Sequence, residues 1–200
     1  MSAPPLVLAS ASKARGELLR RAGIAFAIAP AAIDEEEIKA AFRAERQSAA
    51  ECAIALAEAK ASRVARRNPG SLVIGADQML VCDGVWFDKP SDLAAARAQL
   101  LALRGRRHEL ASAVCVVRDG ERLWHFVDRS ILTMRDFSDE FLDHYLAAVG
   151  AAVLGAVGAY HLEGLGVQLF ARIEGGYFAI LGLPLLPLLD FLRGHGVVAQ

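Results

Sequence analysis

Asp77 is the residue whose setting most strongly suggests chemistry, because it is an acid inside the apolar segment 72–82. The β-branched start of this segment predicts a buried strand. Strand alternation then places Gly75 and Asp77 on one face, where the glycine leaves room beside the carboxylate. A buried acid is costly unless it is paired or binds a cation. Asp77 therefore either caps a turn, the commoner role of an isolated aspartate, or belongs to a catalytic site.

Basic residues occupy two further positions that need an explanation. Lys60 falls on the inner stripe of a helix predicted at 48–67. Lys13 and Arg15 lie at the N-terminus of a helix predicted at 13–22, where positive charge opposes the helix dipole. Both placements suit a bound phosphate, which helix N-termini also attract. The ordinary alternatives are a lysine that reaches out to water and two solvated cations.

Four consecutive acids, Asp34 to Glu37, form the third unusual feature. Such a run is usually a solvated loop or the start of a helix. If one of these carboxylates lies near Asp77, the pair could hold a divalent metal, since Mg²⁺ prefers hard carboxylate oxygens.

The elements that must position these residues alternate between strand and helix early in the chain, and antiparallel hairpins follow later. This order predicts an α/β fold with a mixed sheet. The dipeptides Asp83-Gly84 and Asp119-Gly120 favour tight hairpin turns. The predicted elements are strands 6–8 and 25–28, helices 13–22 and 48–67, a hairpin over 72–87, a helix capped by Ser91 with Leu93 on its inner face, paired strands 108–118 and 121–134, a helix after Ser138, a loop at 150–158, a strand at 167–173 and a final helix at 183–192.

The overall composition predicts one soluble cytoplasmic domain over residues 1–200, of which 22% are charged. A net charge of −1 gives no electrostatic reason to expect nucleic acid or membrane as a partner. The three cysteines lack CxxC spacing, so neither a disulfide framework nor a zinc site is indicated. The apolar stretch 180–192 is too short to span a bilayer. Walker, HExxH and GxSxG motifs are absent from the sequence.

Several separated motifs, taken together, resemble the Maf family of nucleoside triphosphate pyrophosphatases. The resemblance implies an α/β fold in which a mixed central sheet lies in two lobes around a deep cleft. It also implies hydrolysis of a nucleoside triphosphate to the monophosphate and pyrophosphate, a divalent metal cation (Mg²⁺ or Mn²⁺) and a homodimer. The motifs are Leu8-Ala9-Ser10-Ala11-Ser12 with Arg15-Gly16-Glu17-Leu18-Leu19, Asp34-Glu35, Leu56-Ala57 with Lys60-Ala61, Gly75-Ala76-Asp77-Gln78, Lys89-Pro90, Gly105 with His108, and Gly182-Leu183-Pro184-Leu185.

The resemblance also implies a role for each unusual residue. Asp77 would accept the proton of the attacking water, and Glu35 would hold the metal with it. The residues that would contact the phosphates are Ser10, Arg15, Lys60 and Lys89. This division of labour suits in-line attack at phosphorus, where a carboxylate orients water and cations neutralise the leaving pyrophosphate.

Two residues bear on which nucleobase the protein would bind. Gln78 and Glu163 look like those of the family branch that acts on 7-methyl-GTP, and a carboxylate suits guanine-like donors. Ala14 and the segment 156–160 depart from the family pattern. The alternative function is a nucleotide-binding regulatory module, linked to cell division, with little turnover. Asp77 favours the enzyme, because a binding module needs no acid to activate water.

Overall fold

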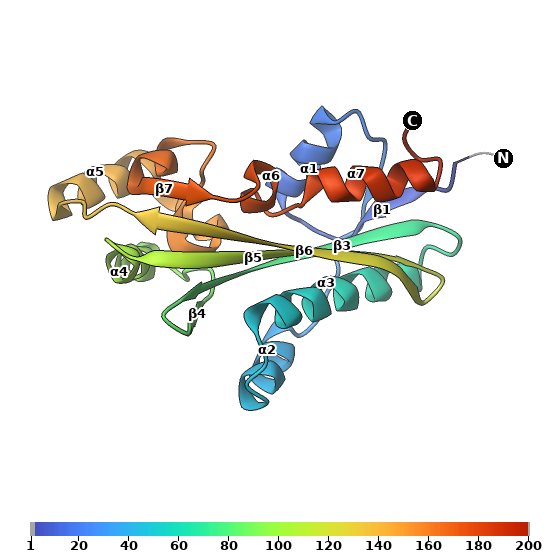
Figure 1. Ribbon diagram of the computed structural model, residues 1–200, viewed down its shortest axis with the longest axis horizontal. Helices are drawn as coiled ribbons and strands as arrows, with labels where there is room; N and C mark the ends of the chain where they lie inside the picture. Colours follow the sequence, from blue (N-terminus) through green and yellow to red (C-terminus); the bar gives the residue numbers. More distant parts are fainter. Residues whose placement is uncertain (1–2, 200) are drawn as a thin grey trace.

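A seven-stranded mixed sheet forms the framework of the molecule (Figure 1), whose computed structural model describes residues 3–199. The strand order is β2-β1-β3-β5-β6-β7, and β4 pairs with β3. Only β2, β1 and β3 are parallel, and every other pairing is antiparallel. The predicted mixed-sheet α/β fold is therefore confirmed. The strands are β1 (Leu6–Leu8), β2 (Ala27–Ile28), β3 (Leu72–Cys82), β4 (Val85–Phe87), β5 (Arg107–Arg118), β6 (Glu121–Met134) and β7 (Phe170–Glu174).

Helices cover both faces of this sheet. In Figure 1, α3 lies on one face with α2 beyond it, whereas α1, α6 and α7 lie on the other. The helices are α1 (Lys13–Arg21), α2 (Glu35–Ala44), α3 (Ala49–Ala65), α4 (Leu93–Leu103), α5 (Asp139–Val149), α6 (Tyr177–Ile180) and α7 (Leu185–Gly194), with 3₁₀ segments η1 (Gly150–Gly155), η2 (Val157–Ala159) and η3 (Leu165–Leu169). None of the described helices combines the length and the hydropathy that crossing a bilayer would require.

The hydrophobic core divides along the length of the sheet. At one end, Leu100 of α4, Leu142 of α5 and Tyr160 pack on one another. At the other end, α1 and α7 pack against β1 and β3, and α3 covers the opposite face. The long strands β5 and β6 run through both ends (Figure 1).

Gly75 allows α3 to lie unusually close to β3. A Cβ at this position would collide with the carbonyl oxygen of Ala57 and lie 2.9 Å from the Cβ of Ala61. The expectation that Gly75 leaves room beside the Asp77 carboxylate is thus wrong, because the backbone of α3 fills that room. The glycine instead brings α3, and Lys60 with it, within reach of Asp77.

One edge of β3 is open in the middle of the strand. β5 pairs with the other edge along 73–81. On the open side, β1 pairs with residues 72–74 and β4 with residues 80–82. Residues 75–79 therefore lie in a gap between two strands, with Asp77 at its centre.

Several predicted boundaries differ from those of the structure. Asp92, rather than Ser91, caps α4, and its side chain accepts a hydrogen bond of 2.7 Å from the backbone N–H of Ala95. Leu93, expected on the inner face, is exposed as the first residue of α4. The strand expected at 167–173 begins as η3, so β7 starts only at Phe170. The expected loop at 150–158 forms 3₁₀ turns.

Candidate active site

Two carboxylates converge on the ammonium group of Lys60. Its Nζ lies 2.5 Å from Oδ1 of Asp77 and 2.8 Å from Oε1 of Glu35. Lys60 is 9% exposed and Asp77 6%, whereas Glu35 is more open to solvent. Burial raises the pKa of Glu35, but the hydrogen bond and the charge of Lys60 outweigh this effect and leave the pKa below its usual value. Three segments that are distant in sequence thus meet at one charged centre.

Local sequence explains why Lys60 points inward. Ser48 and Glu51 form the predicted capping box at the start of α3, which fixes the register of that helix. Periodicity then puts Lys60 on the same stripe as the fully buried Leu56 and Ala57. The prediction that Lys60 occupies the inner face is confirmed.

Arg15 reaches from α1 to the open edge of β3. Its Nε donates to the carbonyl of Gly182 at 2.8 Å, and its Nη1 donates to the carbonyl of Ala76 at 2.8 Å. Nη1 also lies 3.2 Å from Oγ of Ser10, a buried residue. Burial lowers the pKa of Arg15, against the opposing charges of Asp77 and Glu35. Arg15 is thus fixed beside Asp77, whereas Lys13 is exposed.

Lys89 is the third cation near Asp77 and Glu35. It follows β4, which the Asp83-Gly84 turn folds back along β3. Burial lowers the pKa of Lys89, and the positive charge of Arg15 adds to the effect. The charges of Glu35 and Asp77 act in the opposite direction, which places Lys89 within electrostatic range of both. Three cations then surround two carboxylates, so the centre has an excess positive charge that suits a polyphosphate.

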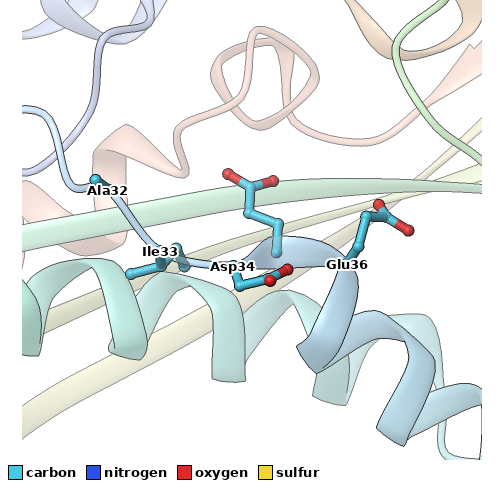
Figure 2. Close-up of a pocket in the computed structure, with 5 residues that line it drawn as sticks. Ala32, Ile33, Asp34 and Glu36 are labelled. Atoms are coloured by element: carbon cyan, nitrogen blue, oxygen red, sulfur yellow. The ribbon is translucent and has the colours of Figure 1, made fainter.

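A pocket of about 600 Å³ opens beside this centre and is lined by the consecutive residues Ala32–Glu36 (Figure 2). Asp34 caps α2 by accepting a hydrogen bond of 3.0 Å from the backbone N–H of Glu37. The run of acids is therefore the start of a helix, and Glu35 within it bonds Lys60. Glu35 joins the pocket to the charged centre.

Gln78 faces the opposite side of the sheet from Asp77. Its Nε2 donates to Oγ of Ser112 at 2.8 Å and to the carbonyl oxygens of Ala179 and Ile180 at 3.2 and 3.0 Å. Ser112 donates its own proton to the carbonyl of Ala179 at 2.7 Å. All three neighbours of the nitrogen are therefore acceptors, which fixes the orientation of the amide. Oε1 of Gln78 makes no hydrogen bond with the described residues and is not buried.

Glu163 is not joined to this centre by any hydrogen bond or ion pair of the described residues. Its carboxylate is partly exposed and lies 3.8 Å from Nδ1 of His161, whose Nε2 is 2.9 Å from the carbonyl of Ala152. The structure thus brings together Ser10, Arg15, Glu35, Lys60, Asp77 and Lys89 and leaves Glu163 apart.

Sequence reasoning missed two polar contacts around the centre. Lys39 of α2 pairs with Asp88, the residue before Lys89, at 2.6 Å. Ser112 binds the amide of Gln78. A signal existed for Lys39, which lies one helical turn after Glu35. Nothing in the local pattern around Ser112 pointed to Gln78.

Residues 5–195 match the family model described as Maf-like protein. The chain belongs to the Maf family. A protein of Paramagnetospirillum magneticum is 60% identical over 190 residues, which cover 95% of this chain and 98% of the relative, and is named nucleoside triphosphate pyrophosphatase. One of Granulibacter bethesdensis with the same name is 58% identical and covers 95% and 96% of the two chains. A Rhizobium meliloti protein, 49% identical with 98% of each chain covered, is named 7-methyl-GTP pyrophosphatase.

The metal expected of a Maf protein fits the residues of the centre only in part. Glu35 and Asp77 supply hard oxygen donors, but both now bond the ammonium of Lys60. Within residues 3–199, no group of three or more His, Cys, Asp or Glu side chains could hold a metal ion. Mg²⁺ commonly uses one or two carboxylates together with substrate phosphates and water. The donor set therefore fits a metal that binds together with the nucleotide.

Proposed function

We propose that this Maf protein hydrolyses 7-methyl-GTP to the monophosphate and pyrophosphate, with Asp77 activating the attacking water. The chain is a nucleoside triphosphate pyrophosphatase, as its family and its relatives at 50–60% identity indicate. The observation that carries the proposed role of Asp77 is the convergence of Asp77 and Glu35 on Lys60 at the open edge of β3.

The geometry of Asp77 supports its role as the base. Lys60 bonds Oδ1, whereas Oδ2 makes no hydrogen bond with the described residues and is not buried. Oδ2 can therefore accept a proton from water while Oδ1 stays fixed. A base held in one orientation is what proton transfer requires.

The cations act on the leaving group. Hydrolysis at the α-phosphorus releases pyrophosphate, whose negative charge grows as the bond breaks. Lys89 makes no ion pair in the described part of the chain, so its ammonium is available to this charge. Arg15 and Lys60 already bond the protein, and they supply a fixed positive field around the phosphates. When bound, Mg²⁺ or Mn²⁺ would be held by Glu35 and Asp77 and would neutralise further phosphate charge.

The polarity of Gln78 supports a guanine-type base. With the nitrogen committed to three acceptors, Oε1 is the atom that remains available to a ligand. An acceptor suits the ring N–H and the amino group of guanine. The role proposed for Glu163, a carboxylate for the positive charge of 7-methylguanine, comes from the family resemblance and not from any bond between Glu163 and the centre; a relative named 7-methyl-GTP pyrophosphatase is 49% identical to this chain.

Pyrophosphate release across a panel of nucleoside triphosphates, including 7-methyl-GTP, tests this proposal. The Asp77→Asn variant should lose at least about a hundredfold in kcat. Glu163→Gln should weaken the use of 7-methyl-GTP more than that of UTP. Equal turnover by wild type and Asp77→Asn would remove Asp77 from the mechanism. An unchanged preference would remove Glu163.

The same panel addresses the alternative of a regulatory module linked to cell division. Nucleotide binding without metal-dependent release of pyrophosphate would favour that module.

A homodimer and a cytoplasmic location belong to the proposal as well. The homodimer comes from the family resemblance, and three buried, unpaired cysteines support a reducing compartment. Analytical ultracentrifugation and cell fractionation test these two points.

A further inference from the structure

Lys39 is a buried lysine that no step of the reaction uses. It is 8% exposed, and its Nζ lies 2.6 Å from Oδ1 of Asp88 and 3.1 Å from Oε1 of Glu36. Burial lowers the pKa of Lys39, but the hydrogen bonds to Asp88 and Glu36 outweigh this effect, so the pKa lies above its usual value. The two carboxylates thus favour the ammonium form of Lys39.

The partner of Lys39 is held from two sides. Arg43, also on α2, lies 3.4 Å from the other oxygen of Asp88. The backbone carbonyl of Asp88 accepts a hydrogen bond of 2.8 Å from Nε2 of Gln99 on α4. Lys89 is the next residue in the chain. The backbone position from which Lys89 extends is therefore set by contacts made one residue earlier.

Helix α2 contacts both the charged centre and Asp88, the residue before Lys89. Glu35, in the first turn of α2, bonds Lys60, and Lys39, one turn later, bonds Asp88. Residues four apart lie on the same face of a helix, so one face of α2 carries both contacts. The packing of Ile38 and Phe42 against the core under α3 fixes the rotation of that face.

We propose that Lys39 is a positioning residue, which fixes Lys89 beside the phosphate site by holding Asp88. This inference rests on the phosphate-binding role proposed for Lys89. Lys39 touches none of the reacting groups, and its contribution passes through the adjacent residue. Loss of the ion pair would leave Asp88 held only by the longer Arg43 contact and by Gln99, so Lys89 would be held less firmly. A displacement of about 1 Å in a group that stabilises a transition state can cost about a hundredfold in rate.

A double-mutant cycle tests this inference. Lys39→Met keeps most of the unbranched apolar stem but removes the charge, and it should lower kcat/KM about tenfold, mainly through kcat, because the charge that Lys89 meets grows in the transition state. In a Lys89→Met background, Lys39→Met should cause less than a twofold further loss. Arg43→Met is the matched control, since Arg43 contacts the same carboxylate at a longer distance and is more exposed. It should lower kcat/KM no more than about twofold.

The outcomes separate this inference from the wider proposal. If Lys89→Met alone leaves kcat/KM unchanged, the proposed role of Lys89 fails and the inference falls with it. If Lys89→Met is impaired but Lys39→Met is not, or if Lys39→Met costs the same in both backgrounds, only the inference is overturned. Should Lys39→Met fail to fold, Asp88→Asn breaks the same ion pair from its more exposed side. It must then show the same dependence on Lys89.

Discussion

Replacing Lys60 should destabilise the fold far more than replacing its ion-pair partner Asp77. Lys60 serves two carboxylates, so Lys60→Met leaves the buried Asp77 without its hydrogen-bonded counter-ion and Glu35 without its hydrogen bond. Asp77→Asn keeps an oxygen that can accept from Lys60, and Lys60 keeps Glu35 at 2.8 Å. Lys60→Met should therefore cost more stability than Asp77→Asn, because both ion pairs share Lys60.

The expected size of the difference comes from burial. Breaking a buried ion pair by removing one partner typically costs about 3–5 kcal/mol, and the nearly complete burial of Lys60 and Asp77 makes that range applicable. The contribution of Glu35 is small, because its side chain is 43% exposed. Asp77→Asn exchanges a charged hydrogen bond for a neutral one and should cost about 1 kcal/mol.

Urea unfolding followed by circular dichroism measures both variants. With a slope of about 2 kcal/mol/M, Lys60→Met should lower the midpoint by about 1.5 M or more, and Asp77→Asn by about 0.5 M. Lys13→Met, at an exposed position, is the control and should leave the midpoint nearly unchanged. If Asp77→Asn and Lys60→Met shift the midpoint equally, Lys60 is not the shared counter-ion and the electrostatic account of the centre is wrong.

Three further predictions follow from other features. Burial lowers the pKa of His108 from 6.5 to about 4, so between these pH values the unfolded chain binds a proton that the folded chain does not. The free energy of unfolding should therefore fall by up to about 3 kcal/mol as the pH drops through this range, and a His108→Gln variant with the same pH slope would contradict this. Gly75→Ala should cost at least about 2 kcal/mol, whereas Gly16→Ala, whose Cβ would meet nothing closer than 3.5 Å, should be tolerated; equal melting temperatures would refute the close approach of α3. Calorimetric titration should show weak binding of Mn²⁺ alone and tighter binding with a non-hydrolysable nucleotide, because Lys60 already occupies the two carboxylates; equal affinities would speak for a preformed site.

The sequence predicted what depends on local pattern. A cap and a helical period sufficed to place Lys60 on the inner face of α3. Positive φ values at Asp83 and Asp119, each followed by glycine, confirm the two predicted hairpin turns. The Maf motifs, spread over most of the chain, predicted membership of the family, and the family match over residues 5–195 confirms it.

The rest depends on how distant elements pack. Lys39 and Asp88 are separated by 49 residues, and no period or cap signal couples them. The amide of Gln78 meets carbonyls of α6 that lie 101 and 102 residues further along the chain. The role of Gly75 was misread for the same reason, since the neighbour that fills its space comes from another element.

The gap along β3 has a consequence for the solubility of the fold. An unpaired strand edge can template pairing with a second chain and so begin aggregation. Arg15 covers the carbonyl of Ala76 within this gap, and the charges of Lys60 and Asp77 lie beside it. Buried and bulky charges disfavour the approach of another strand. The charged groups of the centre thus also protect this open edge of the sheet, and neutralising several of them together should yield protein that self-associates.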